Sequence, residues 1–160
     1  MKLGGLFTKL LSALAAFSAA CILFVTLSIC YEVLGRYFFG RPLMWTVEIS
    51  EYLQIYFVFL SAAWVLRQRG HVTLDIVVGL LGPASRKACT VASDVLGIIV
   101  TLVLSVFSGI MTYEQMVLGI PVIKALEVPK WMVIMPIPLG MALLAVEFAI
   151  KLFTDIRQGE

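Results

Sequence analysis

The residues with the clearest chemical consequence in this chain are two carboxylates that follow a tryptophan. In the stretch GRPLMWTVEISEY, residues 40–52, Glu48 and Glu51 lead into an uncharged apolar run. Facing hydrocarbon would be costly for a carboxylate, so each requires a polar neighbour or a proton. Glu32 and Arg36, spaced i and i+4 in the favourable acid-first order, lie shortly before them. We expect these four residues to form a structural polar cluster; contact of the two later acids with headgroups or with another protein is the alternative.

Three further sets of charged residues invite a structural interpretation. Asp94 is expected to bond to a neighbouring helix through Arg67, and a place in an ion pathway is the alternative. Arg67, His71 and Asp75 are spaced by four residues, which indicates a set that caps and anchors a helix end; three independently solvated residues are the alternative. The last set has the same spacing and is expected to pair along one helix: Glu147, Lys151 and Asp155.

Several kinds of reactive site are excluded by what the chain lacks. His71 is the only histidine, which rules out a bis-histidine haem site within one chain and leaves zinc without its usual ligands. Cys21, Cys30 and Cys89 form no CxxC pair and lie in or near apolar spans, where packing is their ordinary role. No GxxxxGKS/T loop for ATP is present. We therefore expect no catalytic, cofactor or metal site; transport, or support of a transporter, remains.

The composition indicates a membrane protein. Of the 160 residues, 61% are hydrophobic and only 14% are charged. The uncharged run 10–31 covers roughly 33 Å, enough to cross a hydrocarbon layer of about 30 Å. A signal peptide or lipoprotein site is the alternative for this segment, but the run is longer than a signal core. The expected fold is an all-α membrane protein of one domain, 1–160, with four transmembrane helices at about 6–37, 42–67, 84–113 and 131–153.

The connections and the anchors of these helices can also be predicted. The segment at about 72–81 is too short in its apolar middle to span, so we expect it to lie along the membrane surface. An outer loop is expected at 114–130. Pro136 and Pro138 predict a kink or an irregular first turn in the last helix. Three tryptophans are the predicted membrane-interface anchors: Trp45, Trp64 and Trp131.

Orientation follows from the distribution of lysine and arginine. If both termini lie inside, the inner side carries eight basic residues and the outer side four, which favours cytoplasmic N- and C-termini. The net charge of +2 thus reflects topology and gives no reason to expect nucleic acid as a partner. The middle portions of the first, second and fourth expected helices are nearly pure hydrocarbon, and the acids cluster towards the helix ends. A small transporter usually needs polar groups at that depth, so the chain is predicted to pack and position rather than to bind.

Three stretches, in order, resemble the small integral-membrane subunit of tripartite ATP-independent periplasmic (TRAP) transporters. They are GRYFFGRPLMWTVEISEY (35–52), AWVLRQRGHVTLD (63–75) and VPKWMVIMPIPLG (128–140). The residues that carry the resemblance are Arg36, Tyr37, Phe39, Pro42, Trp45 and Glu48, then Arg67, His71 and Asp75, then Pro129, Trp131, Pro138, Leu139 and Gly140. The chain departs from the family at 82–85, which precede Arg86 and Lys87 where further basic residues are common.

The resemblance implies a supporting role in the cytoplasmic (inner) membrane of a bacterium or archaeon. Such a subunit joins a larger sodium-coupled permease subunit as part of its scaffold, sits among membrane lipids and helps to dock a periplasmic binding protein that delivers an organic acid or similar solute. The residues expected to face the binding protein are Arg41, Glu114, Lys124, Glu127 and Lys130. A self-contained four-helix exporter of small cations is the alternative function.

Overall fold

The computed structural model of the chain describes residues 2–40, 44–68, 83–119, 121–122 and 128–157. Its long helices are α1 (Lys2–Phe39), α2 (Met44–Arg67), α4 (Pro83–Leu118) and α6 (Pro136–Arg157). The short elements are β1 (Pro121–Val122), β2 (Val128–Pro129) and α5 (Lys130–Ile134). β1 and β2 pair antiparallel, with Val122 opposite Val128.

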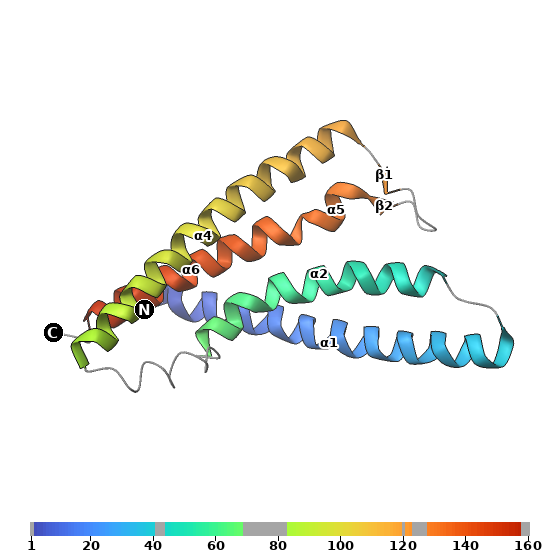
Figure 1. Cartoon of the computed structure of the whole chain (residues 1–160), viewed down its shortest axis with the longest axis horizontal. Coiled ribbons are helices and arrows are strands. Elements are labelled where there is room, and N and C mark those ends of the chain that lie inside the picture. Colours follow the sequence, from blue (N-terminus) through green and yellow to red (C-terminus); the bar gives the residue numbers. More distant parts are fainter. Residues whose placement is uncertain (1, 41–43, 69–82, 120, 123–127, 158–160) are drawn as a thin grey trace.

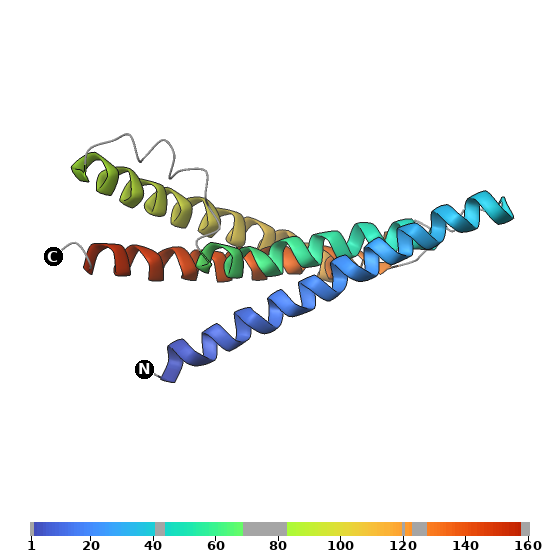
Figure 2. The same ribbon diagram turned by 90° about the horizontal axis from the view of Figure 1, so that it is seen from below.

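The four long helices lie in a row in the order α1, α2, α6, α4 (Figure 1). α2 packs against both α1 and α6, and α6 packs in turn against α4. Figure 2 shows that α1 crosses α2 at an angle. Both chain termini lie at one end of the row, called here the termini end, and the β1–β2 hairpin lies at the other, called here the distal end. α6 therefore has a neighbour on each side.

The described residues contain four helical segments that are long and apolar enough to cross a membrane, which confirms the expected all-α membrane fold. They are Phe7–Phe38, Trp45–Arg67, Ala88–Leu118 and Lys130–Asp155. Among the described residues the buried side chains include six apolar and seven polar or charged ones, whereas many large apolar side chains are exposed. Because a row of helices has two open faces, this distribution suits lipid or a protein partner around the helices rather than water.

Two glycines in the left-handed region end the two helices that run towards the distal end. Gly40, with φ of +64°, follows α1, and its N–H donates to the carbonyl of Arg36 at 3.0 Å. Gly119, with φ of +61°, follows α4 in the same way and bonds to Gln115 at 3.1 Å. A helix commonly ends at such a residue because glycine carries no Cβ to clash there. The expectation that a loop begins at 114 was wrong, since α4 continues through Leu118 to this glycine.

The expected irregular turn at the start of the last helix is present between α5 and α6. Pro136 has no N–H, so it cannot donate to the carbonyl of Met132, four residues earlier. The hydroxyl of Tyr56 on α2 donates to this same oxygen at 2.7 Å. A carbonyl left without a partner inside a membrane is costly. The contact therefore satisfies the group that the proline frees and also ties α5 to α2.

Small residues let α6 approach both of its neighbours closely. A Cβ built on Gly140 would lie 2.7 Å from the carbonyl carbon of Phe59 in α2, and a Cβ on Gly97 of α4 would lie 2.7 Å from the ring of Phe148 in α6. Without a hydrophobic driving force between helices, such close packing is a main source of association in a membrane. Ser105 of α4 adds a hydrogen bond of 3.1 Å to the carbonyl of Pro138.

Replacing Gly140 with alanine should separate α2 from α6, because the new methyl group meets the main chain of Phe59, which cannot rotate away. Overpacking of this kind costs about 1 to 3 kcal/mol. The measurement is the thermal unfolding midpoint of the purified protein in detergent. Gly5→Ala is the matched control, since nothing lies within 4 Å of a Cβ there. Equal midpoints for the two variants would contradict the close approach.

Candidate functional site

Two interhelical ion pairs lie towards the termini end. Arg67 at the end of α2 donates from Nη1 to Oε1 of Glu147 on α6 at 2.8 Å. The Glu147 side chain is 5% exposed and that of Arg67 is 33% exposed. Hydrogen bonding between ionised groups is stronger than between neutral ones, and a buried carboxylate depends on it. This pair joins α2 to α6.

The second pair joins α6 to α4. Lys151 donates from Nζ to Oδ1 of Asp94 at 2.8 Å. The Asp94 side chain is 1% exposed, whereas that of Lys151 is 38% exposed and reaches the surface. Oδ2 of Asp94 has no hydrogen-bond partner among the described residues. Asp94 therefore bonds to a neighbouring helix as expected, but the expected partner, Arg67, was wrong.

Both pairs depend on neighbouring turns of α6. Glu147 and Lys151 are four residues apart, and each binds a different neighbour. The interpretation of Glu147, Lys151 and Asp155 as ion pairs along one helix was therefore wrong for the first two. The reason is that α6 lies between α2 and α4, so the buried carboxylate and the ammonium each meet an opposite charge on an adjacent helix. The four charges sum to zero, which lowers the cost of placing them inside a bundle.

Between these pairs and the distal end, the polar side chains of the helices are mainly hydroxyls bound to backbone carbonyls. Ser18, Ser61 and Thr101 each donate to the carbonyl four residues earlier in their own helix, at 2.6 to 2.9 Å. Thr26 and Ser108 do the same. A hydroxyl bound in this way has given its only proton to its own helix. At this depth the described residues thus offer few donors to a solute.

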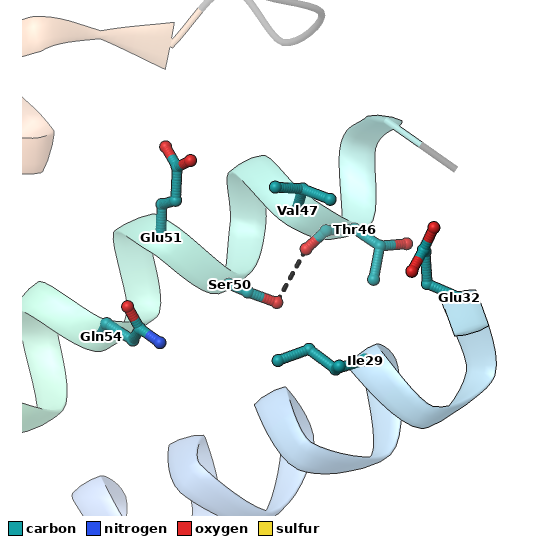
Figure 3. A pocket seen from close by; sticks show the side chains of 7 residues that line it. All are labelled: Ile29, Glu32, Thr46, Val47, Ser50, Glu51 and Gln54. Atoms are coloured by element: carbon teal, nitrogen blue, oxygen red, sulfur yellow. Dashed lines mark hydrogen bonds between the residues drawn. The ribbon is translucent and has the colours of Figure 1, made fainter. Parts of the chain in front are cut away.

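At the distal end the acids of the expected polar cluster separate. Nε of Arg36 lies 4.0 Å from Oε1 of Glu32, a long ion pair within α1, and the guanidinium is largely exposed. Glu32 itself is buried and points towards Thr46 of α2 (Figure 3). Glu48 is half-buried, whereas Glu51 is exposed and points away from α1 (Figure 3). The structure brings Glu32 and Arg36 together, and the wider cluster stays a prediction.

A shallow pocket of about 270 Å³ lies between α1 and α2 at this end. Its lining combines acids, hydroxyls and an amide with two aliphatic side chains: Ile29, Glu32, Thr46, Val47, Ser50, Glu51 and Gln54. Ser50 donates to the carbonyl of Thr46 at 2.7 Å. Thr46 is 1% exposed, and its Oγ1 has no hydrogen-bond partner among the described residues.

Sequence reasoning missed most of this lining. Of the lining residues it singled out Glu32 and Glu51. It did not single out Thr46, Ser50 and Gln54, which are spaced by four residues and so share one face of α2. That stripe was the available signal, since three polar residues on one face of a membrane helix are unusual. What the sequence could not show is that this face meets α1 next to Glu32.

The remaining predicted residues are distributed between the two ends. Trp45 is exposed at the distal end of α2, Trp131 is half-buried at the start of α5, and Trp64 is half-buried near the other end of α2. This placement agrees with the predicted anchors, whose role stays a prediction. Glu114 and Lys130 are exposed near the hairpin. The other predicted positions lie outside the described residues: Arg41, His71, Asp75, Lys124 and Glu127, together with the segment 72–81.

Comparison with known proteins identifies the family. Residues 25–158 match the model of the family described as "Tripartite ATP-independent periplasmic transporters, DctQ component". The chain belongs to this family. A search of curated proteins found no match. The match covers the last part of α1 and all of the later elements, so it includes both ion pairs and the pocket.

Membership gives the coarse function. The chain is a small permease component of a TRAP transporter and a multi-pass membrane protein, and its family is one of transporter components rather than enzymes. Such a component belongs to a complex with a larger permease subunit and a binding protein. The self-contained cation exporter is therefore not favoured.

Lys151→Met should destabilise this TRAP component more than Asp94→Asn does. The first change leaves a carboxylate with 1% exposure unpaired, whereas the second leaves an ammonium that is 38% exposed and can reach water. Stranding a buried charge costs about 3 kcal/mol. The measurement is the thermal midpoint of the purified protein in detergent. Losses of equal size, or a larger loss for Asp94→Asn, would contradict the burial asymmetry on which the prediction depends.

Proposed function

We propose that this small permease component acts as a scaffold for a larger, sodium-coupled TRAP permease subunit. In this proposal the larger subunit carries the sodium and solute sites, and a periplasmic binding protein delivers an organic acid or similar solute. The complex lies in the cytoplasmic (inner) membrane of a bacterium or archaeon, with both termini of the small subunit in the cytoplasm. The excess of lysine and arginine at the termini end supports that orientation.

The observation that carries the proposal is the use of polar groups at mid-depth. There the hydroxyls of the described helices donate mainly to backbone carbonyls, and Tyr56 donates to the carbonyl that Pro136 leaves free. The charged side chains lie nearer the ends, where Arg67 and Lys151 bind carboxylates of neighbouring helices. Alternating access requires a solute site near mid-membrane. A chain whose mid-depth groups serve its own packing is suited to hold a partner in place.

The arrangement in a row favours a partner along the side of the helices. α1 and α4 form the two edges, and α4 exposes large apolar side chains along most of its length. Such a surface can be covered by lipid or by the helices of a larger subunit. At the distal end Glu114 and Lys130 are exposed beside the hairpin, and we propose that they contact the binding protein together with Arg41, Lys124 and Glu127.

The scaffold role predicts that the small subunit depends on its partner for transport. Co-expressed with a larger TRAP permease subunit from the same organism, the tagged chain should purify with that larger protein. Reconstituted alone in liposomes under a sodium gradient, it should give no uptake, whereas the full complex with its binding protein should accumulate solute. Uptake of an organic acid or efflux of a small cation by the isolated chain would overturn the scaffold proposal.

The polar cluster at the distal end gives a second test. We propose that Arg36 interacts with Glu48 to hold the distal ends of α1 and α2 together, whereas Glu51, which points away from α1, takes no part. Arg36→Gln and Glu48→Gln should then each reduce the yield of assembled complex and its uptake. Asp155→Asn, which removes an acid from the opposite end, is the control. Wild-type assembly and uptake for both cluster variants would reject the cluster.

A further inference from the structure

We propose that the pocket between α1 and α2 binds a primary ammonium group, such as that of an ethanolamine lipid headgroup. The pocket lies at the distal end of the small subunit's own helices. The inference does not depend on the scaffold role. It starts from two polar groups in the pocket lining, the buried carboxylate of Glu32 and the hydroxyl of Thr46.

Two of the lining side chains, Glu32 and Thr46, lack a short polar contact among the described residues. Glu32 is buried, and its ion pair with the exposed Arg36 is long at 4.0 Å. Oγ1 of Thr46 is buried without a hydrogen-bond partner among the described residues, and Figure 3 shows it directed towards the Glu32 carboxylate. Buried polar atoms are nearly always paired, so an unpaired one that lines a cavity indicates a ligand.

The neighbouring side chain of Ser50 presents a further acceptor to the pocket. The Ser50 hydroxyl gives its proton to the carbonyl of Thr46, so only its lone pairs face the pocket. A primary ammonium has three N–H donors and a positive charge, which matches a carboxylate beside hydroxyl oxygens. A quaternary ammonium has the charge but no N–H group. The pocket should therefore distinguish between the two.

The size and the aliphatic lining favour an alkyl ammonium over a metal ion. A volume of about 270 Å³ is large for a single cation, and Ile29 and Val47 form part of the wall. Ligand pockets usually combine such apolar surface with a few polar groups that orient the ligand. Ethanolamine has this character, since a short hydrocarbon link carries its ammonium.

The position of the pocket makes a lipid headgroup a suitable source. It lies at the distal ends of two predicted spans, and Thr46 follows Trp45, a residue type that prefers the boundary of headgroups and hydrocarbon. A free amine could supply the same group from water. Both sources share one chemistry, and experiment can separate them.

The test uses the purified full-length chain in detergent, exposed to equal amounts of phosphatidylethanolamine and phosphatidylcholine with identical acyl chains. Native mass spectrometry then measures the ratio of the two bound lipids. We expect a preference of about tenfold for ethanolamine, because its N–H groups form hydrogen bonds to a charged acceptor. Glu32→Gln should remove most of the preference, and Asp155→Asn should leave it unchanged.

Thr46→Val keeps the test decisive if the Glu32 variant fails to fold. Valine has the shape of threonine without the hydroxyl, so losing an unpaired hydroxyl should leave stability unchanged or improved. The preference should nevertheless fall several-fold, and Thr46→Ser should restore it. A wild-type ratio near one, or an unchanged ratio in Thr46→Val, would overturn the proposal.

Competition identifies the source of the ammonium. If millimolar ethanolamine displaces the bound lipid, the pocket accepts the free amine as well, and ammonium recognition is supported directly. If the lipid preference persists under ethanolamine and still falls in Thr46→Val, the pocket requires the whole lipid. Displacement by choline as effective as that by ethanolamine would contradict recognition of N–H donors.

Discussion

The ion pairs made by two neighbouring turns of α6 organise the rest of this structure. Glu147 receives a hydrogen bond from Arg67 of α2, and Lys151 donates one to Asp94 of α4, each at 2.8 Å. Because the carboxylates are buried, neither helix can slide along α6 without breaking a pair and stranding a charge. The two pairs therefore fix the registers of three helices near the termini end, while close packing at Gly140 and Gly97 fixes their separation.

The same requirement, that polar groups find partners inside the protein, governs the middle of the bundle. Hydroxyl groups donate hydrogen bonds to backbone carbonyls of their own helices, and the Tyr56 hydroxyl donates to the carbonyl that has no N–H partner because Pro136 lacks one. Because these polar groups are already hydrogen-bonded, the described mid-depth interior serves mainly to pack the helices together. The large apolar side chains then face outwards, which is the distribution expected of a membrane component of a larger TRAP complex.

The described polar groups at the two ends of the row make different contacts. Near the termini end, four opposite charges meet at short distances across three helices. Near the distal end, Glu32 makes a long contact with Arg36, and the Thr46 hydroxyl has no hydrogen-bond partner among the described residues. The buried charges near the termini end thus fix the positions of helices, whereas buried Glu32 near the distal end lines a pocket.

By itself the sequence determined the number of spans, their approximate limits and the breaks between them, because these depend on local hydrophobicity, glycine and proline. It also placed the acids near the helix ends. Tertiary structure alone decided the ion-pair partners. Glu147 and Lys151 could pair with each other along α6, but α6 lies between α2 and α4, so these two residues bind Arg67 and Asp94 instead. Tertiary structure likewise decided the pocket. The polar face formed by Thr46, Ser50 and Gln54 lies beside Glu32 only because that face of α2 packs against α1. Hydrophobicity and helix breaks are properties of a single segment, whereas a contact depends on how two helices are placed relative to each other.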